Sequence, residues 1–371
     1  MLALELPTVH RIPVTWLRQH ACVPIRWRTV HEILPSGSAS PADVDLLREE
    51  LLQYKRVTQT TRKQKTTGIW GKNILGLAAS KAQSINDVGT VAQYRHLVEL
   101  GLPSDDRALR LAERPLFRLL SRDSDPALLF EYQKGAKTNP ALGLWAREFL
   151  REGATAALAH AGHSEDPRVR GAAHRIATNI SRHLRSELSE KPIVRKGARN
   201  MLHPEACPPS LFAVAIIAYM PSMLRERAGF VDRLGHYLAQ TATKRAWVIQ
   251  VGRKAITPTY HFLGDPLKAD SAGNPKDLPF ALHWIELLVR MGVLETSGTA
   301  QRILARLYRD CDADGVWSPK NLRSIPRSSS KLGDFAFPLE LDGKTSERRR
   351  ADVTFRLALI AKLAGWETEY I

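Results

Sequence analysis

The sequence predicts a mainly α-helical fold made of paired helices. Three observations indicate this: apolar residues recur at helical spacing along most of the 371 residues, strand-like runs are scarce, and one turn motif occurs twice. Hydrophobic residues make up 44% of the chain, which is enough for a large core and argues against global disorder.

The first 40 residues are expected to form an N-terminal helical segment, and 41–371 a single large helical-repeat domain. In 42–57, an apolar stripe includes Leu47 and Leu51, and the preceding "SASPADVD" supplies capping residues and a proline near the first turn. Residues 210–220, "SLFAVAIIAYM", are expected to form a buried helix because the run is too short to span a bilayer.

Further helices are expected along the rest of the chain. The segment 87–120 predicts two, because Gly101 and Pro103 end the first and the polar residues 104–106 open the second. The segment 166–188 has an apolar stripe on one face and basic residues on the other. The remaining helical segments are 280–293, 299–308 and 352–365.

One stretch has β-like composition. Residues 245–264 are expected to hold either a short β-hairpin or an irregular crossing. Two long polar loops follow, at 264–279 and 318–351, and loops of such length in a compact domain are often functional.

The charge balance indicates an anionic partner. Lys and Arg number 54 against 38 Asp and Glu, a formal net charge of +16, which fits nucleic acid or a pyrophosphate-bearing substrate. The alternative is an Arg-rich composition without functional meaning. The three scattered cysteines suit a reducing cytoplasm, and the N-terminus lacks the pattern of a signal peptide.

The repeated turn carries a family resemblance. "QKTTGIWGKN" at 64–73 and "CDADGVWSPKN" at 311–321 share Gly, an apolar residue, Trp and then Lys-Asn. The first copy resembles the Gln-x3-Gly-x-Trp element of the terpenoid cyclase and protein prenyltransferase superfamily. "CVPIRWRTVHEIL" near the N-terminus is similar to a segment that precedes the helical domain in bacterial relatives. The matching positions are Gln64, Gly68, Trp70, Gly315 and Trp317, with Cys311 in place of Gln in the second copy.

This resemblance implies an α/α toroid in which the Gln and Trp of each element are structural. The sequence lacks the catalytic motifs of that superfamily. Neither Asp-x-Asp-Asp nor Asp-Asp-x-x-Asp occurs, and the adjacent Asp310-Cys311 does not match the zinc-ligand spacing of the prenyltransferases.

The aspartates Asp310, Asp312 and Asp314 are the candidate catalytic acids. Together with Gly315 they also match the first half of a calcium loop, but Asn321 stands where a bidentate Glu is usual. Calcium or another divalent metal at 310–321 stays an alternative to a plain turn, and no other metal or cofactor is expected. Histidines do not cluster, because Gly162 breaks the helix between His160 and His163.

Basic clusters are the candidate polyanion-binding residues. Those at 168–185 can share a helical face through their spacing, and "DPRVRGAAHRIATNI" also resembles a helix of HEAT-like repeats. Solvated surface charge is the alternative. The candidates are Arg62, Lys63, Lys65, Arg168, Arg175, Arg182, Arg185, Lys244, Arg245, Arg253, Lys254, Arg348, Arg349 and Arg350.

Two functions follow from the sequence. The first is a helical-repeat protein that binds a polyanion, with nucleic acid as the preferred partner. The second is a cyclase- or prenyltransferase-like enzyme with a divergent acid, acting on an isoprenoid or another apolar small molecule in a cavity. Fold-level likeness alone does not decide between them.

Overall fold

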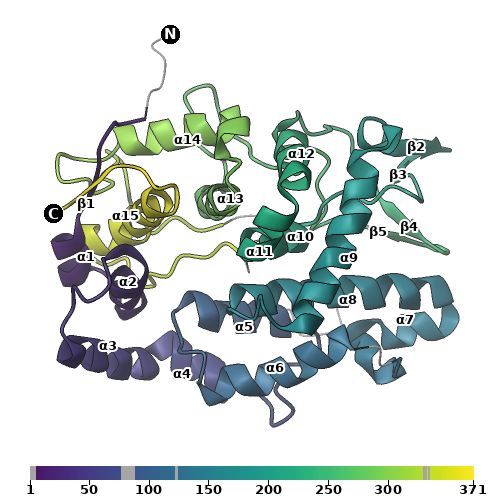
Figure 1. Ribbon diagram of the computed structural model, residues 1–371, viewed down its shortest axis with the longest axis horizontal. Helices are drawn as coiled ribbons and strands as arrows, with labels where there is room; N and C mark the ends of the chain where they lie inside the picture. The colour runs from purple at the N-terminus through teal and green to yellow at the C-terminus, as the bar shows by residue number, and fades with distance from the viewer. Residues whose placement is uncertain (1–5, 77–87, 122–123, 329–331, 333–334) are drawn as a thin grey trace. The chain divides into compact units, whose positions relative to one another are not determined.

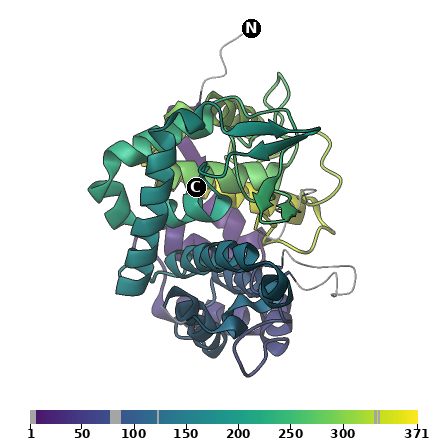
Figure 2. The ribbon, with the colours of Figure 1, turned by 90° about the vertical axis from the view of Figure 1, so that its right-hand side faces the viewer.

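The computed structural model describes residues 6–76, 88–121, 124–328, 332 and 335–371 (Figures 1 and 2). The chain is mainly helical with a few short strands, as predicted. It divides into two compact units. Unit 1 comprises Met1–Gln59, Glu99–Leu102 and Leu267–Ile371, and unit 2 comprises Thr60–Val98 and Pro103–Pro266. The boundary expected at residue 40 lies inside unit 1, because the first helices pack with the C-terminal ones.

Unit 1 is built around two buried helices, α13 (Leu278–Arg290) and α15 (Ser346–Leu363), which pack against each other. Every residue of 279–289 and of 351–361 is buried, and helices buried on all sides form the centre of a core. Around them lie α1 (Val14–His20), α2 (Val23–Arg28), the π-helix η1 (Thr29–Ile33), α3 (Pro41–Gln53), η4 (Leu294–Thr296) and α14 (Gly298–Arg309).

The two ends of the chain meet in unit 1. Strand β1 (His10–Ile12) pairs in parallel with β6 (Thr368–Tyr370), so the purple and yellow ends of the ribbon run together (Figure 1). This pairing joins the N-terminal segment to the C-terminal part of unit 1.

Unit 2 centres on the 21-residue helix α8 (Pro140–His160), which packs against three helices: α6 (Arg107–Leu120), α9 (Pro167–Leu184) and α10 (Leu211–Ala218). Helix α10 is buried throughout, as its apolar sequence predicts. The other helices are η2 (Pro126–Tyr132), α7 (Gln133–Thr138), η3 (Glu187–Ser189), α11 (Pro221–Glu226) and α12 (Ala228–Ala239). Helices α4 (Lys55–Arg62) and α5 (Thr90–Glu99) each cross the division between the units. No described helix combines the length and the apolarity needed to cross a membrane.

Two β-hairpins complete unit 2 (Figure 2). Strands β4 (Ile249–Val251) and β5 (Lys254–Ile256) pair antiparallel around Gly252, which confirms the hairpin expected within 245–264. Strands β2 (Ile193–Lys196) and β3 (Arg199–Leu202) form a second hairpin that was not predicted from the sequence. Half of its strand residues are polar and most are only partly buried or exposed, and apolar and polar residues occur in pairs, so the strands lack the alternation that marks a strand in sequence.

The two copies of the turn motif adopt the same backbone arrangement, one in each unit. Gln64 bridges Trp70, and Cys311 bridges Trp317 in the same antiparallel manner. In both, the Trp backbone N–H donates to a threonine hydroxyl, at 3.2 Å for Thr90 and 3.1 Å for the second copy's Thr354. Both tryptophans are buried at 4% exposure, so they serve packing rather than a ligand.

The first copy is held more tightly than the second. The Gln64 amide donates to the carbonyl oxygens of Gly68 at 3.0 Å and Ala108 at 2.8 Å, while the Trp70 indole N–H donates to Thr60 at 2.8 Å. In the second copy Cys311 replaces the glutamine, and its thiol donates a weak hydrogen bond to the Leu307 carbonyl oxygen at 3.6 Å. The glutamine of the motif therefore acts as a structural tie.

We expect Gly68→Ala to destabilise unit 2 by more than Gly162→Ala does. Both glycines have a left-handed backbone, with φ of +88° and +93°, so each substitution costs about 1 kcal/mol of backbone strain. A Cβ on Gly68 would also overlap the Leu111 carbonyl oxygen, whereas one on Gly162 meets open space. Urea denaturation of the two variants measures the difference, and equal midpoints would contradict this account of the turn.

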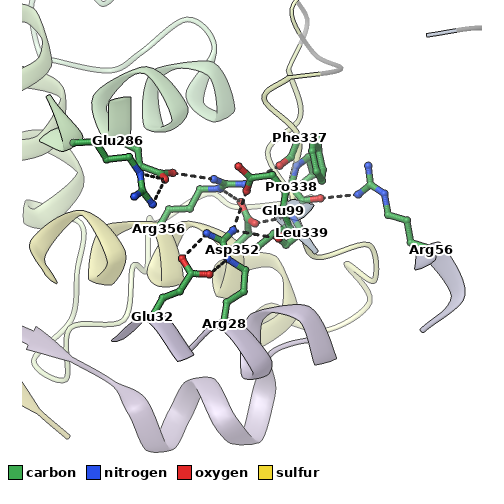
Figure 3. Close-up of polar contacts among 11 residues, drawn as sticks. Arg28, Glu32, Arg56, Glu99, Glu286, Phe337, Pro338, Leu339, Asp352 and Arg356 are labelled. Atoms are coloured by element: carbon green, nitrogen blue, oxygen red, sulfur yellow. Dashed lines mark hydrogen bonds and ion pairs between the residues drawn. The ribbon is translucent and has the colours of Figure 1, made fainter. Parts of the chain in front are cut away.

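A buried network of ion pairs lies in unit 1 (Figure 3). Arg28 of α2 forms a bidentate pair with Glu32, at 2.5 and 2.8 Å, and donates to the Glu99 carboxylate at 2.9 Å. Its guanidinium also lies over the Phe355 ring, 5.1 Å from the centroid. The Arg28 and Glu99 side chains are 5% and 2% exposed, so this pair is shielded from solvent.

A second part of the network surrounds Arg356 of α15. Its guanidinium donates to Asp352 at 3.3 Å and to the Phe337 carbonyl oxygen at 3.0 Å, and it lies 3.9 Å from the Glu286 carboxylate (Figure 3). Burial alone would lower the pKa of Arg356, yet the carboxylates of Asp352 and Glu99 raise it. Arg356 is therefore held charged inside the core.

The network also fixes an irregular segment. Asp352 accepts from the Leu339 backbone N–H at 2.7 Å, and Arg56 donates to the Pro338 carbonyl oxygen at 3.0 Å (Figure 3). The long loop predicted at 318–351 is thus tied to the core near its middle. Because its arginines and carboxylates are engaged with one another and with backbone groups, the role of the network is structural.

Candidate polyanion-binding site

An open cleft in unit 2 gathers four arginines. It lies between the C-terminal half of α9 and the start of α12, which pack against each other, and it has a volume of about 960 Å³. We call it the arginine cleft. Its lining residues are Thr178, Ser181, Arg182, Arg185, Ser186, Glu226, Arg227, Ala228, Gly229, Phe230 and Arg233.

Helix α9 places the first two arginines. Asp166 caps its N-terminus by accepting from the Arg168 backbone N–H, and the buried stripe includes Val169 and Ile180. With that stripe turned to the core, Arg182 and Arg185 lie three residues apart at the exposed C-terminal end.

Helix α12 places the other two arginines. Arg227 stands at its N-cap position, where no side chain accepts a hydrogen bond from the first turn. The N-terminus of a helix carries a partial positive charge, which here adds to the charge of Arg227 and Arg233. The Arg227 guanidinium donates to the Thr178 hydroxyl at 3.1 Å, which orients it beside α9.

The cleft has little opposing charge. Glu226 is the acidic residue among its described lining residues, and its carboxylate is occupied by Arg170 at 2.9 Å and His174 at 3.2 Å. His183, just behind Arg182, is neutral because burial lowers its pKa to about 4. The net charge facing the cleft therefore comes from the four arginines.

A second basic cleft, of about 640 Å³, lies against the C-terminal end of α12. Lys191, Arg195 and Arg245 line it, with Glu190 as an acidic neighbour. Tyr237 of α12 also contributes, and its buried hydroxyl has no partner among the described residues. Of the predicted residues, this cleft includes Arg245.

The remaining predicted residues of unit 2 are dispersed. Arg168 pairs with Asp166 at 2.8 Å and lies over the Phe117 ring, 4.0 Å from its centroid. Arg175 is exposed on α9, and Lys65 donates to the Gly71 carbonyl oxygen. The others are exposed at the end of α4 or around the β4–β5 hairpin: Arg62, Lys63, Lys244, Arg253 and Lys254.

The cluster at 348–350 belongs to unit 1, at the start of α15. Arg348 pairs with Glu340 at 3.1 Å, Arg349 donates to the Gly343 carbonyl oxygen at 2.7 Å, and Arg350 donates to the Ser318 hydroxyl at 3.1 Å. These contacts tie the 318–351 loop to the helix. The three arginines thus have structural partners of their own.

The candidate acids at 310–314 form a turn. Asp310 pairs with Arg306 at 2.6 Å, and Asp312 accepts from the backbone N–H groups of Asp314 and Val316. Gly315 has a φ of +81°, as such a turn requires. None of the three aspartates lines a cavity described here, and no group of metal-ligating side chains occurs among the described residues.

Arg227 and Arg233 were not predicted from the sequence. They are distant in sequence from the α9 arginines and join them only through helix packing. The sequence contained one indication of Arg227: it occupies the N-cap position of a helix, where Ser, Thr, Asp or Asn is usual.

The chain matches no family model, no curated protein and no solved structure. The resemblance to the terpenoid cyclase and prenyltransferase superfamily therefore stays a prediction.

Proposed function

We propose that the protein binds a polyanion, preferably nucleic acid, through the arginine cleft. The observation that carries the proposal is the convergence of Arg182, Arg185, Arg227 and Arg233 on one open cleft whose glutamate is already paired. Arginine is suited to phosphate because its planar guanidinium donates two parallel hydrogen bonds. The formal net charge of +16 favours association with such a partner from a distance.

The arrangement supports contacts to the phosphate backbone rather than to base edges. The cleft offers guanidinium groups and helix N–H groups, which read charge and position but not sequence. We therefore expect weak discrimination between sequences and a strong dependence on salt.

The test measures binding of the full chain to a fluorescent random duplex and to a single strand, at 50 and 200 mM salt. Four phosphate contacts predict a slope of about −3.6 in log affinity against log salt for a duplex, or a loss of about 100-fold between these concentrations. Comparing the duplex with a random single strand of equal length shows which of the two forms of nucleic acid the protein binds more tightly. Absence of salt-sensitive binding to both would overturn the proposal.

The cyclase-like alternative requires a carboxyl group that faces an apolar cavity. Asp310 and Asp312 do not supply it, since Asp310 pairs with Arg306 of α14 and Asp312 accepts from backbone N–H groups of the turn. Glu152 faces a cavity in unit 2, but the polar side chains of His203 and Gln250 line it as well. No described feature favours isoprenoid chemistry over polyanion binding.

A further inference from the structure

Unit 2 contains a second kind of cavity, with acidic character. It has a volume of about 390 Å³ and lies among α8, α9, the segment 202–208 and strand β4. This size is within the range of small-molecule sites. We call it the Glu152 cavity.

One face of α8 supplies its key side chains. Trp145, Glu148 and Glu152 follow at i, i+3 and i+7, so they lie along one stripe of the helix. The Trp145 ring stacks on Phe149, with centroids 5.0 Å apart, and meets Tyr132 edge-on at 5.8 Å. These aromatic contacts fix the indole at the cavity wall.

The charge of the cavity is opposite to that of the chain as a whole. Two glutamates line it, and none of its described lining residues is a lysine or an arginine. Glu148 pairs with Arg151 at 2.7 Å, but Arg151 is not one of the residues that line the cavity. Glu152 accepts a hydrogen bond from the Ser210 hydroxyl, a neutral group, so its negative charge has no cationic counterpart in the cavity.

Two other titratable groups of the wall, His261 and Cys207, add no positive charge at neutral pH. Burial lowers the pKa of His261 to about 4, and desolvation raises the pKa of the Cys207 thiol to about 12, so both are neutral. Burial also raises the pKa of Glu152 to about 7, which is the cost of holding a carboxylate there without a cation. His203 is the remaining imidazole of the wall.

We propose that the Glu152 cavity binds a small organic amine in its cationic form. The ammonium group would pair with the Glu152 carboxylate and lie against the Trp145 ring, where the ring quadrupole attracts a cation. Ile176 and Ile180 of α9 offer apolar surface for the body of the ligand. This site is separate from the arginine cleft, and the proposal does not depend on polyanion binding.

The test uses benzylamine as the probe and benzyl alcohol as its neutral counterpart, with calorimetric titration of the full chain at pH 8. Benzylamine is expected to bind at least tenfold more tightly than benzyl alcohol. Glu152→Gln, which keeps an acceptor for Ser210, is expected to remove this preference. The control Glu165→Gln removes an exposed carboxylate away from the cavity and should leave it unchanged.

The pH profile gives a second readout. A carboxyl with a pKa of about 7 is mostly protonated at pH 6 and mostly ionised at pH 8, so benzylamine affinity should rise about tenfold over that range. The same cavity is also lined by Glu148, His203, Cys207 and His261. A His203→Gln variant shows whether the His203 imidazole contributes to the pH dependence of benzylamine affinity. Equal affinity of wild-type protein for the two probes, or a preference that survives Glu152→Gln, would overturn the proposal.

Discussion

Replacing Arg356 by methionine is expected to lower the free energy of unfolding by about 3–5 kcal/mol. The Arg356 side chain is 5% exposed, while Asp352 and Glu286 beside it are 4% and 2% exposed. Methionine fills much of the same space, but it leaves two buried carboxylates without this cation and the Phe337 carbonyl oxygen without its donor. The cost is therefore the loss of a cationic partner for buried carboxylates rather than the opening of a cavity.

Urea denaturation followed by tryptophan fluorescence measures this effect. The matched control is Arg302→Met on the exposed face of α14, for which a change within about 0.5 kcal/mol is expected. Adding Asp352→Asn to Arg356→Met should recover part of the loss, because the amide is neutral and keeps an acceptor for the Leu339 N–H. If Arg356→Met changes the free energy of unfolding as little as Arg302→Met does, the network does not stabilise the core of unit 1.

The sequence predicted the helices of this core but not the network inside it. Helical spacing in 280–293 and 352–365 was visible, and both segments form central helices. Glu286 and Arg356 were signals in retrospect, since each is a charged residue within an apolar run. Their pairing could not be inferred, because it depends on how two helices distant in sequence pack together.

The candidate site shows the same limit. Arg182 and Arg185 were predicted because local periodicity places them on the solvent side of one helix. Arg227 and Arg233 were missed because only the packing of α9 against α12 brings them there. Periodicity determines which face of a helix is exposed, whereas the neighbour across a cleft is a property of the tertiary fold.

The same contrast applies to the repeated turn. Its shared Gly and Trp positions correctly indicated one backbone arrangement in two places, because a left-handed glycine and a buried indole are local requirements. The aspartates of the second copy resembled a functional motif, yet Asp312 is used to close the turn. Asp and Gly are frequent in turns for this reason, so such a motif predicts a turn more reliably than a site.

Charge removal from the arginine cleft is expected to weaken nucleic-acid binding by about 100-fold at 50 mM salt. Arg182→Gln with Arg185→Gln removes two of the four cleft arginines, and each lost phosphate contact costs about tenfold at this salt concentration. Both side chains are exposed at the end of α9 and contribute nothing to its buried stripe, so the fold should be retained.

The salt dependence distinguishes a specific cleft from general positive charge. The double variant should reduce the magnitude of the duplex salt slope by about 1.8, because two fewer counterions are released. Arg302→Gln with Arg309→Gln removes the same net charge from exposed positions of α14 and should leave the slope unchanged. Equal losses in the two double variants would mean that the overall charge of the chain, and not the arginine cleft, accounts for binding.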